Sequence, residues 1–276
     1  MRFLIPLLFV LCATPFASVS NGAEWLSRGD LYYAQRAVGA SNDRADRLNA
    51  LNTVNAYKIA MEDPNVHRTA GIRLLRALYF QGCFAFLDKD DRLRIFSEAK
   101  TIGEKLILKY PNDPDLAYWY SVNLSLWAKE SGPIVAVRSG VAETIRKVTE
   151  NATVRQKPQP AMAGVYQVLG RMHHLLPRIP FLLPWPNKEM AEKYLGLAAT
   201  LDPSNLANPL FLAEFYRDMG RFEDARRVIS PLKSRVPRVG QELEDRRNLW
   251  KLRDLEASLR LLGDSRQLAA VLTSDK

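Results

Sequence analysis

The sequence predicts an all-α fold built from antiparallel helix pairs stacked in series. Apolar residues recur at helical spacing in most segments between the proline-rich breaks. No stretch sustains the alternation of apolar and polar residues that marks a β-strand. Ala and Pro also recur at a fixed interval late in the chain, which indicates a repeated helical unit.

The interval defines the repeat. Ala191 and Pro203 stand 12 residues apart, as do Ala225 and Pro237, and the two alanines are 34 residues apart. Positions around the second pair match the tetratricopeptide pattern, with Pro in place of its first Trp and Ala in place of its Gly. We therefore predict a tetratricopeptide-like stack with irregular repeats toward the N-terminus and a C-terminal capping helix.

Six helices are expected in the first half of the chain, most of them separated by turn sequences. Residues 44–61 carry an apolar stripe and end before Pro64, while residues 66–87 are apolar nearly all round, which favours a central position. Pro114 closes the turn after the fourth helix, and Pro133 is placed to start the sixth. The expected helices span residues 25–38, 44–61, 66–87, 92–109, 115–129 and 134–150.

Five more helices are expected in the second half. Pro160 opens residues 161–176, and Asn187 is a suitable N-cap for residues 187–201. Residues 206–219 and 221–236 form the pair that fits the repeat. Residues 240–262 have leucines on one side and charges elsewhere, which suits a terminal helix whose outer face stays in water.

A proline-rich insertion interrupts the repeat. From Leu169 to its counterpart Leu212 the chain takes 43 residues, nine more than the period. Prolines 177, 180, 184 and 186 place the extra residues in a loop between two antiparallel helices. Its apolar residues Ile179, Phe181 and Trp185 have no packing role in a plain repeat. Either the loop folds back as a lid, or it contacts a ligand or partner.

The N-terminus reads as a secretory signal peptide, residues 1–23, followed by a single helical domain, residues 24–276. Cys12 comes early and follows two large apolar residues, so a lipid anchor is not expected there. Cleavage leaves Cys83 alone, which excludes a disulfide within the mature chain. No later run of apolar residues is long enough for a membrane helix, so we expect a soluble exported protein.

The net charge of +9 falls to +8 when Arg2 is removed with the signal peptide. A basic balance of this kind fits an Arg-rich solvated surface, anionic lipid or an acidic protein, and export makes nucleic acid the least expected partner.

Catalytic groups are sparse. His67 stands alone, and His173 and His174 are adjacent, about 100° apart on a helix, rather than at the spacing that shares a zinc ion. We expect no enzyme activity, metal or cofactor.

Several segments resemble a known family. They are Leu169-Gly170-Arg171, the loop Leu176-Pro177-x-Ile179-Pro180-Phe181-Leu182 with Trp185 and Lys188, the unit from Leu201-Asp202-Pro203 to Gly220, and the helix containing Tyr118-Trp119-Tyr120, Asn123 and Trp127. These residues resemble the TatT family, tetratricopeptide proteins associated with TRAP transporters. The likeness covers roughly residues 70–236. It implies a protein of the bacterial periplasm that pairs with the solute-binding subunit of a TRAP transporter and handles a small apolar ligand. Members of this family are commonly lipoproteins, but Cys12 does not follow the small residues that a lipidation signal requires, so this chain departs from the family at that point. The alternative is a general cell-envelope scaffold for protein–protein interaction.

The candidate binding residues are the aromatic and loop positions named in this likeness, together with the two adjacent histidines. The sequence is also compatible with a homo-oligomer. The candidates are Tyr118, Trp119, Asn123, Trp127, His173, His174, Arg178, Ile179, Phe181 and Trp185.

Overall fold

A computed structural model describes residues 21–154, 157–181 and 183–274, with side chains described as far as residue 262. The expected signal peptide falls almost entirely on residues 1–20, outside the described ranges. Within these ranges the chain is helical, and β-structure is limited to two isolated bridges. None of the described helices is long and apolar enough to cross a membrane.

Seven α-helices form the first half of the stack, one more than expected, because the helix predicted over residues 134–150 is divided. Gly140 has a φ of +61°, a left-handed conformation that breaks the helical path and suits Gly. The third helix ends in a π-helical turn, Gln81–Ala85, rather than continuing as α-helix. The helices are α1 Gly22–Ala34, α2 Arg47–Met61, α3 His67–Phe80, α4 Lys89–Lys109, α5 Pro114–Ser131, α6 Pro133–Arg138 and α7 Val141–Thr153.

The second half contains the regular repeats. The predicted N-cap is confirmed, since the Asn187 side chain accepts hydrogen bonds from the amides of Glu189 and Met190 at 2.7 and 3.1 Å. The helix expected over residues 221–236 is shorter, because Pro231 lies in a 3₁₀ turn, Ser230–Leu232. The final helix is longer than predicted. The helices are α8 Ala163–Leu175, α9 Lys188–Leu201, α10 Ala207–Asp218, α11 Phe222–Ile229 and α12 Glu242–Ser274.

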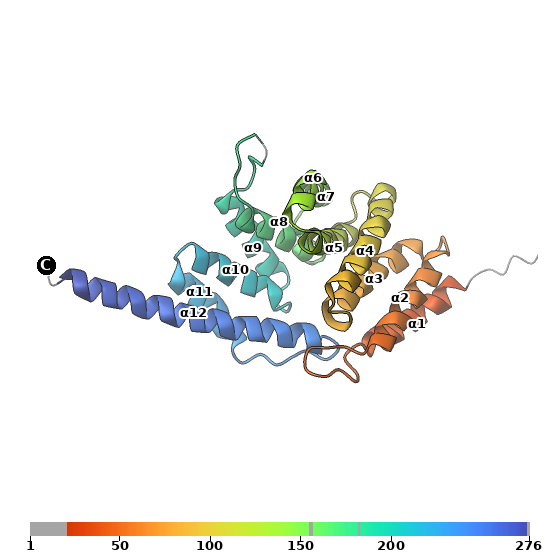
Figure 1. Cartoon of the computed structure of the whole chain (residues 1–276), viewed down its shortest axis with the longest axis horizontal. Helices are drawn as coiled ribbons and strands as arrows, with labels where there is room; N and C mark the ends of the chain where they lie inside the picture. The colour runs from red at the N-terminus through yellow and green to blue at the C-terminus, as the bar shows by residue number, and fades with distance from the viewer. Residues whose placement is uncertain (1–20, 155–156, 182, 275–276) are drawn as a thin grey trace, which may run out of the picture.

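The helix pairs follow one another in an arc, and α12 runs along its open side (Figure 1). Neighbouring helices pack as antiparallel pairs, α1 with α2, α4 with α5, α8 with α9 and α10 with α11. The largest apolar cluster extends from α1 to α9 and also includes Leu243 at the start of α12. Leu252, Leu255 and Leu259, further along α12, belong to a second cluster with α10 and α11. The last helix therefore joins two parts of the core.

Candidate functional site

An aromatic group lies where α3 and α5 pack together. The ring centroid of Trp119 is 5.5 Å from that of Tyr79 and 4.8 Å from that of Tyr118. All three side chains are half-buried, and burial raises the pKa of both tyrosines, so the hydroxyl groups stay protonated. The guanidinium of Arg247 on α12 lies 3.8 Å from the ring centroid of Phe84, and that ring lies 6.4 Å from the ring of Tyr79. The aromatic group is therefore on the side of the arc that α12 faces.

Two other α5 candidates lie in different surroundings. Asn123 is fully buried, and its amide donates to the carbonyl oxygens of Leu75 at 2.9 Å and Trp119 at 2.8 Å. Its amide therefore holds α5 against α3. Trp127 is half-buried, and the Lys100 ammonium lies 5.4 Å from its ring centroid, within the range of a cation–π contact.

The proline-rich insertion forms a narrow hairpin. Ile179 and Leu183 exchange two backbone hydrogen bonds, with N···O distances of 2.9 and 2.7 Å. Phe181 lies at the turn with a φ of +64°, unusual for a residue with a side chain, and its side chain is fully exposed. Ile179 is 40% exposed, and Arg178 is exposed as well. Leu182 lies outside the described residues. The hairpin thus projects from the stack (Figure 1).

The base of the hairpin is anchored in the stack. Trp185 packs against the main apolar cluster, and its ring meets that of His173 edge-on, with centroids 5.2 Å apart. His173 Nδ1 accepts a hydrogen bond from the backbone amide of Asn187 at 3.1 Å, which requires the neutral ring with its proton on Nε2. Burial, assisted by the charge of Arg146, lowers the pKa of His173. The loop therefore combines an anchored base with a projecting tip.

His174 belongs to a separate polar group between α8 and α10. Its Nε2 lies 3.0 Å from Oδ2 of Asp218, and Arg171 pairs with Glu214 at 2.6 Å. Burial and the charge of Arg171 lower the pKa of His174, and together they outweigh the upward effect of Asp218. The neutral ring donates from Nε2 to Asp218. The two adjacent histidines consequently serve different contacts, His173 toward the hairpin and His174 toward the next repeat.

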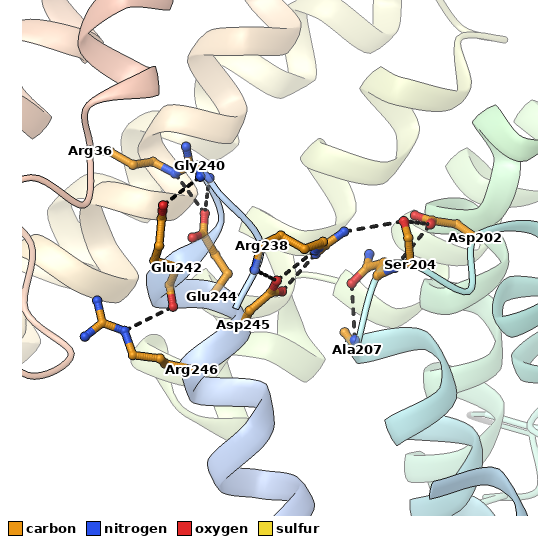
Figure 2. A network of polar contacts seen from close by, with 11 residues as sticks. Arg36, Asp202, Ser204, Ala207, Arg238, Gly240, Glu242, Glu244, Asp245 and Arg246 are labelled. Carbon is orange, nitrogen blue, oxygen red and sulfur yellow. Dashed lines mark hydrogen bonds and ion pairs between the residues drawn. The ribbon is translucent and has the colours of Figure 1, made fainter. Parts of the chain in front are cut away.

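A polar network at the start of α12 was not predicted from the sequence (Figure 2). The buried guanidinium of Arg36, just after α1, pairs with Glu244 at 2.9 Å. Asp245 is fully buried and accepts three hydrogen bonds from Arg238, one from its backbone amide. Arg238 in turn reaches Ser204, between α9 and α10, at 3.4 Å. The start of α12 thus ties the first helix to the later repeats, across separations that no local pattern reveals.

Within the described residues, no group of three His, Cys, Asp or Glu side chains converges as a metal site would require. The single described cysteine, Cys83, is a free thiol, and burial raises its pKa to about 11. At neutral pH this thiol is protonated and therefore a weak nucleophile.

Comparison with known proteins identifies the fold. A thermophilic TPR protein of Thermus thermophilus superposes with a TM-score of 0.55 at 18% identity, covering 87% of this chain and 99% of that one. The predicted all-α tetratricopeptide-like stack is confirmed by this likeness and by the helix order. No family model matches the chain, and the search of curated proteins gives no significant match.

Proposed function

We propose that this chain is a non-enzymatic, exported binding protein that holds a protein partner on its helical stack. The observation that carries the proposal is the part-exposed aromatic group of Tyr79, Tyr118 and Trp119 on the side of the arc facing α12. Repeat stacks use their inner surface to bind other chains, and aromatic residues contribute much of the energy at protein interfaces. Fold alone does not establish a function, so the site carries the proposal.

The partner that we propose is the solute-binding subunit of a TRAP transporter, in the periplasm, with a small apolar ligand as a third component. The resemblance of the hairpin and of the α5 aromatics to the TatT family supports this choice. Tyr118 and Trp119 are the proposed contact residues, and Trp127, which lies against Lys100 of α4, is a separate candidate. Asn123 supports them by fixing α5 against α3. The alternative, a general envelope scaffold, keeps the same contact surface and differs in the partner.

The test is direct binding of the purified mature protein to immobilised TRAP solute-binding subunits encoded in the same genome. Trp119→Ala should weaken binding about tenfold or more, the effect of removing an interface anchor worth over 1 kcal/mol. Leu108→Ala is the control, because Leu108 is 84% exposed on α4 and is not part of the aromatic group. Both variants are checked for native circular dichroism and thermal unfolding. Absence of binding by the wild type would rule out the TRAP partner and leave the scaffold alternative.

A further inference from the structure

A second surface lies on the edge of the arc opposite α12, where α6, α7 and the hairpin are found (Figure 1). No residue of α6 is buried, and Ile134 and Val137 are 68% and 63% exposed. The hairpin tip, Phe181, is fully exposed. The two projections belong to connected parts of the stack, because α7 packs on α8 and the guanidinium of Arg146 lies 5.8 Å from the ring centroid of Trp185. We call residues 133–188 the basic segment.

The basic segment holds most of the net charge of the chain. It contains eight Arg and Lys residues and two Glu, a net charge of +6 out of +9 for the whole chain, and one of the eight, Arg171, pairs with Glu214 outside the segment. Both glutamates, Glu143 and Glu150, are paired with Arg146 at 2.6 and 2.9 Å. Arg138, Lys157 and Arg178 are exposed, and none of these three has an ion pair with another described residue. Exposed apolar side chains are therefore accompanied by cations that have no carboxylate partners among the described residues.

We infer that this edge docks on an anionic lipid membrane surface. Apolar side chains that project singly, from a hairpin tip and a short helix, fit an interface that they can enter independently, whereas a protein pocket would need to match both. The flanking Arg and Lys side chains would bind lipid phosphates, and each cation held near such a surface strengthens binding roughly fivefold. The inference goes beyond the proposed function, whose partner contact lies on the side facing α12.

The anchored base fits this role. Trp185 and the His173–Asn187 hydrogen bond hold the hairpin base on α8 and α9, so insertion of the tip requires no rearrangement of the stack. Phe181 and Arg178 contribute no buried contact of their own, so they can be replaced without removing core packing. The membrane contact can therefore be tested separately from folding.

The experiment is flotation of the mature protein with vesicles of phosphatidylcholine, with and without phosphatidylglycerol, at low and high salt. We expect binding only to the phosphatidylglycerol vesicles, weakened by salt. Phe181→Ser should weaken it about tenfold, from lost apolar burial. The double variant Arg138→Gln, Arg178→Gln should weaken it about 25-fold, the product of two lost cations. Leu108→Ser, at a residue 84% exposed on α4, and Lys105→Gln, exposed on the same helix, are the matched controls and should bind like the wild type.

Several outcomes would overturn the inference. These are absence of binding to phosphatidylglycerol vesicles, equal losses in the control variants, or release by inorganic phosphate at matched ionic strength, which would indicate a phosphate site rather than a surface. If Phe181→Ser instead abolished binding to a protein partner and left vesicle binding unchanged, the hairpin would be a protein contact. If the wild-type protein binds its protein partner but does not bind phosphatidylglycerol vesicles, this inference is refuted and the proposed function stands.

Discussion

Leu243→Ala tests whether α12 joins the two parts of the core. Leu243 is fully buried at the start of α12, within the cluster that extends from α1 to α9. Truncating a buried Leu to Ala costs about 2–5 kcal/mol, the loss of transfer free energy plus a cavity term. The neighbouring ion pair of Arg36 with Glu244 limits how far the site can collapse, so we expect a loss of about 3 kcal/mol in the free energy of unfolding. Urea denaturation followed by circular dichroism measures it.

Hydrogen exchange locates the same effect. The variant should lose amide protection at the end of α1 and the start of α12, while the cluster of Leu252, Leu255 and Leu259 with α10 and α11 keeps its protection. Leu108→Ala is the control, since Leu108 is 84% exposed and its truncation should change stability by less than about 0.5 kcal/mol. A loss below about 1 kcal/mol in Leu243→Ala, or unchanged exchange at α1, would refute the proposed junction.

Three further predictions concern the later repeats. A Cβ added to Gly170 would lie 2.6 Å from Cγ of Leu195 on α9, so Gly170→Ala should lower the free energy of unfolding by about 1–3 kcal/mol. A Cβ added to Gly196 would meet nothing within 4 Å, so Gly196→Ala should raise the free energy of unfolding by about 0.5–1 kcal/mol. Thermal unfolding of the two variants measures both changes. Burial lowers the folded-state pKa of His173 and His174, so the unfolded chain binds protons first and stability is lost as the pH falls below about 6.5. Between pH 7.5 and 5.5 the urea midpoint of the wild type should fall, and that of the double variant His173→Gln, His174→Gln should fall less. Asn187→Ala should lose about 1 kcal/mol of stability and Asn187→Asp much less, in the same denaturation assay; equal losses would argue against capping.

The fold was predictable where local chemistry decides it. The 34-residue interval predicted the repeat, and Asn187 ahead of a charged first turn predicted the start of α9. The four prolines placed the insertion correctly. They did not predict its hairpin, because Phe181 adopts a left-handed conformation that sequence preferences assign to Gly or Asn. Gly140, which adopts a left-handed conformation, is the residue of the sequence that marks the break between α6 and α7.

The surroundings of the candidate residues were harder to predict. Tyr118 and Trp119 are neighbours in sequence, but their aromatic partner Tyr79 comes from another helix. Adjacent histidines gave no indication that one supports the hairpin and the other the next repeat. The network of Arg36 with Glu244 joins residues 208 positions apart, so it depends on how the arc closes. Such contacts follow from tertiary packing, which helical periodicity does not specify.

The most direct test of the central claim, that the stack binds a protein partner through its α5 aromatics, is in-cell crosslinking of the exported protein followed by affinity purification and mass spectrometry. Wild type is compared with Trp119→Ala and with the control Leu108→Ala, a residue 84% exposed on α4. The account predicts that a TRAP solute-binding subunit is recovered with the wild type and the control, and at least about tenfold less with Trp119→Ala. Recovery of the same unrelated envelope proteins with all three chains would contradict it.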